Sequence, residues 1–432
     1  MIELIILAIF AVSLFLCIGL DISIIVALLL GFALFFFYGI YKKHSAREMF
    51  FFALSGIRTT RNILITFVLI GIITALWRAC GTIPYIVYYS TRFCTPQTMV
   101  LFTFLLCCLI SFLTGTAFGT AATMGVICVT LANSMGIPVL YSGGAVLAGS
   151  YFGDRCSPMS TSALLVSSLT DTSLFRNIKV MIKTSFVPFI LSCILYLIPG
   201  MGFASGKESS EVLELFREYF VFHPAALIPA AVIILFSLLR INVKITMSVS
   251  ILCSIAVSVL IQQLPLSELI QAAIFGFQPA DPDVSALLSG GGIVSMIKVC
   301  VIVCLSSCYS GMFDGTGLLD GMRKGLLHIS EKITPYGGIL LTSVLTGMVS
   351  CNQTLTIMLT HQLCCDIEKD PESLASHLEN TAVVIPPLIP WSIASTVTLT
   401  SVNAPLLCIL TAFYLYLLPL WNYAVILYKR TK

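Results

Sequence analysis

The sequence predicts an all-α polytopic membrane protein with about 10–12 transmembrane helices and two inverted-topology repeats that contain broken or re-entrant helices. Three observations predict this fold: the composition, a series of long apolar runs, and two interrupted segments with matching spacing. Of the 432 residues, 58% are hydrophobic and 10% are charged, whereas soluble domains carry about 25% charged residues. We therefore expect a multi-pass protein of the cell membrane, with the lipid bilayer as its surroundings.

The apolar runs supply the membrane spans, since a helix needs about 20 residues to cross a bilayer. They cover residues 2–19, 22–41, 62–77, 97–113, 184–200, 224–239, 245–262, 299–313, 336–351 and 396–420. No Lys or Arg precedes the first run, and no small-residue cleavage site follows it. We expect this run to be retained as a helix and not removed as a signal peptide.

The basic residues predict the orientation, because Lys and Arg stay on the cytoplasmic side in short loops. With both termini in the cytoplasm, 16 of the 23 basic residues fall on that side. They are Lys42, Lys43, Arg47, Arg58, Arg61, Arg176, Lys179, Lys183, Arg240, Lys244, Arg323, Lys324, Lys332, Lys429, Arg430 and Lys432. The outer side then holds Arg78, Arg92, Lys207, Arg217 and Lys369. The net charge of +3 therefore reflects basic residues in cytoplasmic loops and not a basic surface patch. No nucleic-acid partner is predicted.

Most of the 16 cysteines lie inside apolar runs. In that setting they act as small hydrophobic residues. Cys300, Cys304 and Cys308 recur every four residues and so lie on one face of a helix. Because small residues are typical of helix contacts in membranes, we interpret this face as a packing surface and not as a metal site.

An internal repeat is predicted from spacing and direction. Thr114 precedes Pro158 by 44 residues, and Thr346 precedes Pro390 by the same 44. The run ending near Thr114 enters from the outside, whereas the run ending near Ser350 enters from the inside, so the copies are inverted. We divide the chain into an N-terminal hairpin with its cytoplasmic loop (1–61), repeat 1 (62–200), connecting helices and loops (201–292) and repeat 2 (293–432).

Four segments interrupt these repeats, at residues 114–120, 153–158, 350–354 and 385–391. They combine glycine, proline, hydroxyl, amide and charged residues, and three prolines fall within residues 386–390. Such backbone cannot remain an ordinary lipid-facing helix. Matching broken segments in inverted repeats are the best sequence indication of a transporter's binding site near the membrane midplane.

Asp154 is the strongest candidate residue, since a carboxylate at membrane depth costs about 2.5–3.5 kcal/mol on insertion scales. Burial favours the protonated acid and a bound cation favours the ionised form, so H⁺ and Na⁺ would compete for it. The alternative is structural: Asp154 pairs with Arg155 or caps a helix that begins at Pro158.

The other candidates supply polar groups around the breaks. Hydroxyls and freed carbonyls could complete a Na⁺ shell, and amides can bind a cation through oxygen or an organic anion through nitrogen. Glu379 is either a solvated loop residue or a cavity residue. The set comprises Thr114, Thr116, Thr120, Ser157, Ser160, Asn352, Gln353, Glu379, Asn380, Thr381 and Ser392. No catalytic motif of the common enzyme classes is present, so we do not predict an enzyme.

These motifs resemble the NhaC family of sodium/proton antiporters. Members carry GTAxGT, GDKxSPLSDT, and an ED pair followed by SPLIPWN; this chain has GTAFGT at 115–120, GDRCSPMS at 153–160 and PLIPWS at 387–392. The resemblance covers roughly residues 60–430. It implies Na⁺- or proton-coupled antiport by two inverted repeats, with Na⁺ and H⁺ as transported or coupling ions and no cofactor.

Three acids expected from the resemblance are neutral here: Thr161, Asn352 and Asn380. Fewer anions should weaken the binding of small cations. An organic carboxylate or amino acid exchanged with Na⁺ or H⁺ therefore stays open as the substrate, as does a membrane protein without transport activity. Assembly into a homo-oligomer also stays open.

Overall fold

The computed structural model describes residues 2–20, 22–59, 61–90, 95–158, 160–201, 208–239, 241–317 and 333–430. Within these residues every regular element is a helix, and one isolated bridge joins Phe277 to Gly290. The predicted all-α fold is confirmed. Seven basic residues assigned to a side of the membrane lie outside the described residues: Arg92, Lys207, Arg240, Arg323, Lys324, Lys332 and Lys432.

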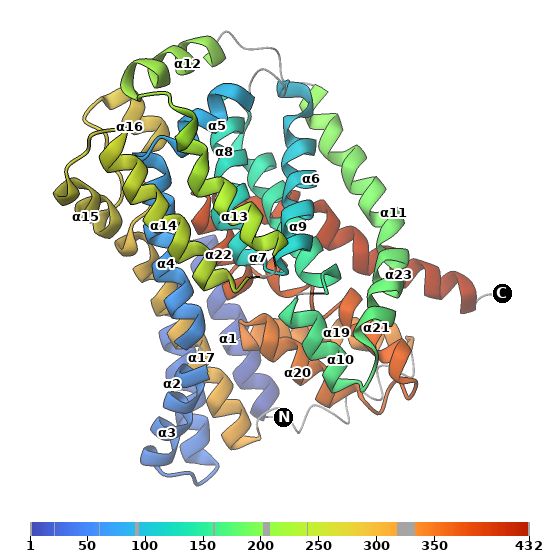
Figure 1. Ribbon diagram of the computed structural model, residues 1–432. Coiled ribbons are helices and arrows are strands. Elements are labelled where there is room, and N and C mark those ends of the chain that lie inside the picture. Colours follow the sequence, from blue (N-terminus) through green and yellow to red (C-terminus); the bar gives the residue numbers. More distant parts are fainter. Residues whose placement is uncertain are drawn as a thin grey trace.

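An N-terminal group of helices forms the long arm in the lower left of Figure 1. It contains α1 (Ile2–Gly19), α2 (Ile24–Tyr41) and α3 (Ala46–Thr59). Helix α4 (Arg61–Ala79), with which repeat 1 begins, runs upward from this arm, and α5 (Thr82–Ser90) lies in the upper half of the picture. Helix α3 packs closely on α17 (Ile297–Thr316) because glycines lie at the contact. A methyl group on Gly56 would overlap the Ser307 carbonyl, and one on Gly311 would overlap the Phe52 carbonyl. The arm therefore joins the start of the chain to the first helix of repeat 2.

Repeat 1 contains a helical hairpin in the upper half of Figure 1. Helix α6 (Pro96–Thr114) is followed by α7 (Ala117–Thr120), a π-helical turn (Ala121–Gly125) and α8 (Val126–Ser134), and these elements contact α6. The chain turns at Gly115, which has a left-handed φ of 67°, and Thr116, which is extended. The Thr116 hydroxyl then caps α7 by accepting the Gly119 N–H. The polar sequence at 114–120 thus produces the predicted break.

A second break follows in repeat 1. Helix α9 (Val139–Cys156) ends before Pro158, and α10 (Thr161–Leu169) begins after Ser160, whose hydroxyl accepts the Ser162 and Ala163 N–H groups. Helix α9 crosses so close to α6 at Gly153 that a methyl group on this glycine would overlap the Phe112 backbone. Helix α11 (Leu174–Met201) then runs back along the molecule.

The connecting region supplies shorter helices, most of them in the upper left of Figure 1. They are α12 (Glu208–Tyr219), α13 (Ile228–Leu238), α14 (Val243–Leu260), α15 (Leu266–Phe275) and α16 (Pro282–Leu288), with 3₁₀ turns at Pro224–Leu227 and Ile293–Met296.

Repeat 2 contains a corresponding hairpin in the lower half of Figure 1. Helix α19 (Pro335–Ser350) ends at Cys351, which has a left-handed φ of 54°, and α20 (Gln353–Cys364) begins after the extended Asn352. This is the same sequence of backbone conformations as at Gly115 and Thr116. The two hairpins lie in opposite halves of the molecule, which supports the inverted repeat; the division into domains stays a prediction.

The last part of repeat 2 is more interrupted than predicted. Helix α21 (Pro371–Asn380) leads through a 3₁₀ turn (Pro386–Leu388) to α22 (Ile393–Ser401), and a further 3₁₀ turn (Leu406–Thr411) precedes α23 (Phe413–Arg430). The expectation of one continuous span over 396–420 is therefore wrong. Pro405, which precedes the second 3₁₀ turn, cannot donate the backbone hydrogen bond that a continuous helix requires.

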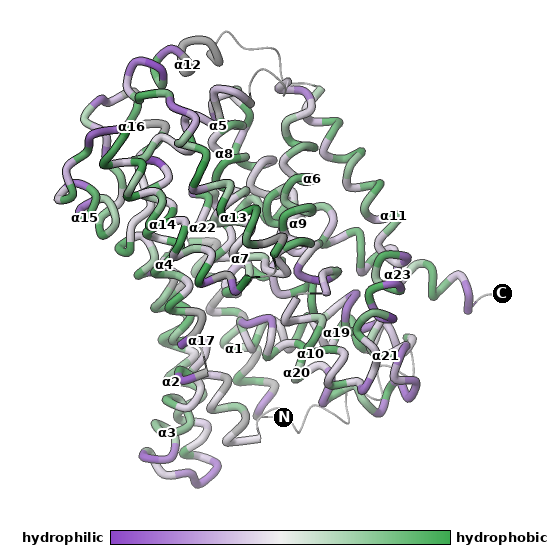
Figure 2. Tube along the Cα trace, in the orientation of Figure 1, coloured by the Kyte–Doolittle hydropathy of each residue, from purple (hydrophilic) through white to green (hydrophobic). Residues whose placement is uncertain are grey.

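Four stretches of helix are long and apolar enough to cross a membrane: Pro96–Thr114, Ala117–Ser134, Leu174–Met201 and Ile293–Phe313. Shorter apolar helices include Ile25–Tyr41 and Lys244–Leu260. Figure 2 shows hydrophobic residues along the middle of the molecule and hydrophilic segments at α3 below and around α12 and α15 above. The polytopic membrane fold is confirmed.

One assignment of side is corrected by the structure. Arg176 Nη1 lies 2.7 Å from Glu372 Oε1, so the loop between α20 and α21 lies beside the start of α11. Lys369, which is in that loop, is therefore on the same side as Arg176 and not on the opposite one. The hairpin returns α20 to the side from which α19 entered, a reversal that hydropathy alone does not reveal.

Candidate cation and substrate site

The four breaks lie at contacts between the two repeats. Helix α10 of repeat 1 contacts α20 of repeat 2, and α7 with its π-helical turn contacts α22. Each hairpin therefore places its polar turn against the broken helix of the other repeat. This arrangement brings together residues separated by about half of the sequence.

Asp154 is the centre of one such contact. It lies in the last turn of α9 and is 5% exposed. Its Oδ2 accepts hydrogen bonds from Gln353 Nε2 at 3.0 Å and from Ser162 Oγ at 3.1 Å. Gln353 Nε2 also donates to the Val383 carbonyl at 2.9 Å, so it ties the hairpin of repeat 2 to both broken helices. The structure thus brings together two predicted site residues, Asp154 of repeat 1 and Gln353 of repeat 2.

Arg155 does not pair with the Asp154 carboxylate. The guanidinium is fully buried, and its donors reach neutral acceptors on α9, α11, α21 and α23. These acceptors are the Glu379 carbonyl, the Met181 carbonyl, Ser185 Oγ, Thr184 Oγ1, Tyr414 OH, Cys156 Sγ and Asn380 Oδ1. The structural alternative for Asp154 also fails as a cap, because α10 begins at Thr161 and is capped by Ser160.

Glu379 and its two neighbours are all buried, so Glu379 is not a solvated loop residue. Asn380 accepts from Arg155, and Thr381 accepts from Ser343 Oγ at 3.0 Å while donating to the His377 carbonyl. Neither carboxyl oxygen of Glu379 has a hydrogen-bond partner in the described part of the chain. The carboxyl group lies within electrostatic range of Arg155 and Asp154.

The candidate serines act at the ends of the broken helices. Ser160 Oγ lies 2.8 Å from Ser162 Oγ, and Ser162 in turn donates to Asp154. Ser160 is therefore linked to Asp154 through Ser162. Ser392 caps α22 and donates to the Cys351 carbonyl at 3.3 Å, joining the two breaks of repeat 2. Ser157 is buried in the turn that follows Asp154, where its N–H donates to the Gly153 carbonyl at 2.8 Å.

The candidate threonines of repeat 1, Thr114, Thr116 and Thr120, form a separate group. Thr120 Oγ1 donates to the Thr116 carbonyl at 2.9 Å and lies 3.4 Å from Thr114 Oγ1. These bonds stay within the turn at 114–120, against α22 and not against Asp154. The structure therefore separates this hairpin group from an Asp154 group, made of Asp154, Gln353, Ser157 and Ser160, and from Glu379, Asn380 and Thr381 at the end of α21.

The three neutral replacements occupy different settings. Thr161 is exposed at the start of α10, whereas the buried Ser162 contacts Asp154. Asn352 caps α20 by accepting the Thr354 N–H at 2.9 Å. Asn380 accepts from Arg155, where an acid would form an ion pair.

Sequence reasoning missed Ser162 and the groups that hold Arg155: Thr184, Ser185 and Tyr414. Ser162 follows the capping residue Ser160 by two positions, and this local pattern could have indicated it. Thr184 and Ser185 sit inside the apolar run 184–200, where hydroxyls often bond to their own helix. Their role depends on the distant Arg155, which the sequence does not place beside them.

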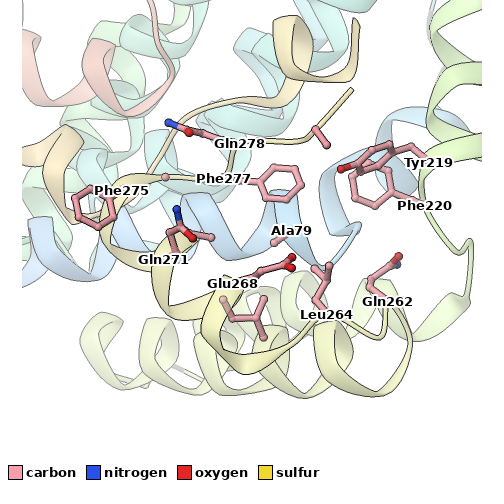
Figure 3. Close-up of a pocket in the computed structure, with 14 residues that line it drawn as sticks. Ala79, Tyr219, Phe220, Gln262, Leu264, Glu268, Gln271, Phe275, Phe277 and Gln278 are labelled. Carbon is pink, nitrogen blue, oxygen red and sulfur yellow. The ribbon is translucent and has the colours of Figure 1, made fainter. Parts of the chain in front are cut away.

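Two cavities lie in the described part of the chain, and the larger one borders the break at residues 385–391. One, of about 1340 Å³, is largely apolar and borders Ile385, Pro390, Trp391 and Lys298. The other, of about 520 Å³, is shown in Figure 3; aromatic residues such as Phe220 and Phe277 surround it with Gln262 and Glu268. Asp154 lines neither cavity.

Comparison with known proteins identifies the family of this chain. The sequence profile of the Na⁺/H⁺ antiporter family matches residues 1–171 and 149–421. The chain is 25% identical over 387 residues to a malate-2H⁺/Na⁺-lactate antiporter of Bacillus subtilis, covering 86% of this chain and 82% of that protein. It is 23% identical over 378 residues to the Na⁺/H⁺ antiporter NhaC of the same organism, covering 84% and 83%. It is 25% identical over 362 residues to the arginine/ornithine antiporter ArcD of Halobacterium salinarum, covering 80% and 74%.

Proposed function

This chain belongs to the Na⁺/H⁺ antiporter family, and from that premise we propose that it exchanges Na⁺ for protons at Asp154. The observation that supports this site is the buried Asp154 carboxylate, which is hydrogen-bonded to Gln353 of the opposite repeat. The match to this family of transporters and the similarity to the NhaC antiporter confirm the predicted resemblance. We place the protein in the cell membrane with both termini in the cytoplasm.

The geometry supports coupling through competition for one anion. The Asp154 carboxylate, the Ser162 hydroxyl and nearby backbone carbonyls are hard oxygen ligands of the kind that bind Na⁺. A proton on Asp154 removes the charge that attracts Na⁺, so the two ions bind alternately. Because Gln353 belongs to the hairpin of repeat 2, occupation of Asp154 can change the contact between the repeats.

A second candidate substrate is an organic carboxylate or an amino acid, exchanged with Na⁺ or H⁺. The neutral Asn352 and Asn380 support it, since amides bind organic groups through both donors and acceptors. Relatives of this chain are named for malate and lactate and for arginine and ornithine. A flux screen in proteoliposomes, with Na⁺ alone and with a panel of carboxylates and amino acids, separates the two substrates.

The decisive experiment compares Asp154→Asn with wild type in proteoliposomes loaded with a pH-sensitive dye. We expect an imposed Na⁺ gradient to drive protons in the opposite direction through wild type. The Asn variant should lose this proton flux. The amide keeps the size of the side chain and an oxygen that accepts from Gln353 and Ser162, but it cannot ionise. Thermal stability in detergent should stay near that of wild type, because no buried charge remains to be desolvated.

Glu268→Gln is the matched control, since Glu268 is an exposed carboxylate on α15. It should retain wild-type flux. Normal flux in the Asp154 variant, or a general loss of folding without a specific flux defect, would show that Asp154 is not the exchange site.

A further inference from the structure

Glu379 is a buried carboxyl group to which no side chain or backbone group of the described residues donates a hydrogen bond. It is the second-to-last residue of α21, its side chain is 0% exposed, and neither Oε1 nor Oε2 has a partner among the described residues. An ionised carboxylate in this position is disfavoured far more than a neutral acid, because nothing replaces its lost hydration. The surroundings therefore favour the protonated acid in this conformation.

Arg155 is the buried cation beside Glu379, yet it does not bond to the Glu379 carboxyl group. Its Nε donates to the backbone carbonyl of Glu379 at 2.9 Å, and its Nη atoms reach neutral oxygens and a sulfur. Asp154 is the adjacent residue in the chain. One buried cation is therefore accompanied by two buried carboxyl groups, Asp154 and Glu379.

The other titratable groups around Glu379 are Cys156 on α9, Tyr414 on α23, His377 on α21 and Tyr336 on α19. Tyr414 OH and Cys156 Sγ accept from Arg155 and need no charge to do so. The His377 ring packs edge-on against Tyr336 with centroids 5.1 Å apart. His377 is two residues from Glu379, so the two side chains point to different faces of α21. Arg155, Asp154 and Glu379 thus set the charge of the cluster.

On the basis of the antiport proposed above, we propose that Glu379 is a proton-binding site separate from Asp154, and that it releases its proton only when Na⁺ joins Asp154. In the state where Asp154 has already given up its own proton and Glu379 is still protonated, the charges of Arg155 and Asp154 cancel. With both carboxyl groups ionised, the cluster carries one net negative charge, which one Na⁺ neutralises. The proton leaves the Glu379 hydroxyl for water, so one H⁺ is exchanged for one Na⁺ without net charge movement.

Asn380 fixes this charge balance in this chain. Its amide oxygen accepts from Arg155 Nη2 without contributing a charge. An acid at this position would supply a second anion directly to Arg155, and the cluster would then need another cation or proton. The neutral Asn380 therefore leaves the balance of Arg155 to Asp154 and Glu379.

Infrared difference spectroscopy of the purified protein tests the protonation step without transport. Adding Na⁺ to wild type should remove the carbonyl stretch of a protonated carboxylic acid. Glu379→Gln should lack this change, and the exposed control Glu268→Gln should keep it. A change of equal size in Glu379→Gln would overturn the assignment of the proton to Glu379.

Flux in proteoliposomes tests the coupling. Glu379→Gln should retain the thermal stability of wild type, since an amide replaces a neutral acid, but Na⁺-driven proton flux should fall to the level of liposomes without protein. Glu379→Asp keeps an ionisable group and should restore part of the flux, which also guards against a folding defect in the Gln variant. Wild-type flux in Glu379→Gln, or no recovery in a folded Glu379→Asp, would overturn the proposal.

The response to membrane potential tests the one-for-one balance. A potassium diffusion potential set with valinomycin should leave the wild-type exchange rate unchanged, and a rate that follows the potential would overturn the balance. If wild type exchanges no Na⁺ for H⁺, the proposed antiport fails. The Na⁺-induced infrared change would still decide whether Glu379 loses a proton.

Discussion

The candidate site is held together by hydrogen bonds between residues that lie far apart in the sequence. Asp154 and Gln353 are 199 positions apart, and Arg155 reaches the carbonyl of Glu379 and the side chain of Asn380. Each of these residues is buried or partly buried between the repeats. Single substitutions should therefore affect ion binding or stability according to the partner that each residue loses.

Asn352→Asp should strengthen Na⁺-dependent stabilisation. Asn352 Oδ1 caps α20, and Asp is an equally good capping residue, so the fold should persist. The new charge lies next to Gln353 and would attract a cation to the Asp154 group. Binding to the native state adds RT ln(1 + [L]/Kd), about 2.7 kcal/mol at a hundredfold excess over Kd. Thermal melts with and without Na⁺ measure this difference, and an unchanged Na⁺ response would rule out a cation role for position 352.

Arg155→Lys should destabilise the protein much more than Arg176→Lys. The planar Arg155 guanidinium donates in several directions to buried groups, and an ammonium cannot reach all of them. Each buried acceptor left unsatisfied costs about 1–3 kcal/mol. Arg176 forms an exposed ion pair with Glu372, which contributes little. Equal melting temperatures for the two variants would contradict the role assigned to the Arg155 contacts.

The sequence indicated several candidate residues but not which of them contact one another. Asp154 was identifiable because a charge in an apolar segment requires a reason, and Asn352 with Gln353 because adjacent amides require partners. The hydrogen bond from Gln353 to Asp154 depends on how the hairpin of repeat 2 packs, which spacing along the chain does not specify. The same reason explains why the alternative pairing of Asp154 with Arg155 was wrong.

At the scale of elements, glycine decides how closely helices approach. Helix α9 crosses α6 at Gly153, where an added methyl group would overlap the backbone of Phe112 and Ser111. Backbone atoms within a helix cannot move aside as a side chain can. The position of Asp154, one residue later, therefore depends on this contact.

Gly153→Ala should destabilise the protein by about 1–3 kcal/mol, the usual cost of overpacking. It should also reduce flux, because α9 must move away from α6 and carries Asp154 with it. Gly39→Ala on α2 is the matched control: its methyl group meets the flexible end of Met49, which can rotate away. Thermal melts of both variants measure the contrast. A Gly153 variant as stable as the Gly39 variant would show that the α6–α9 contact is looser than described.

The breaks between elements were predictable, whereas their directions were not. Glycine, proline and polar residues at 114–120, 153–158, 350–354 and 385–391 all coincide with helix ends in the structure. Hydropathy does not indicate whether the chain continues across the membrane after a break or turns back as a hairpin. For α19 and α20 it turns back, and this is why the prediction placed Lys369 and Arg176 on opposite sides although they lie on the same side.

At the scale of the whole molecule, the hairpins make the two repeats depend on each other. The hairpin of repeat 2 contacts α10 of repeat 1, and that of repeat 1 contacts α22 of repeat 2. Movement of one repeat against the other would therefore change both contacts together, as alternating access requires. This arrangement also makes the orientation of the hairpins a property that can be tested in membranes.

A protease site inserted after Lys369 should be cut only from the cytoplasmic side. The Arg176–Glu372 ion pair places this loop beside the start of α11, where Arg176, Lys179 and Lys183 form a basic cluster. Such clusters remain in the cytoplasm. We therefore expect cleavage in inside-out vesicles and protection in right-side-out vesicles. The same site inserted after Ala280, in an exposed loop that follows α15, should show the opposite pattern. Cleavage after Lys369 in right-side-out vesicles would mean that α20 continues across the membrane, and that the hairpin that brings Gln353 to Asp154 does not form in the bilayer.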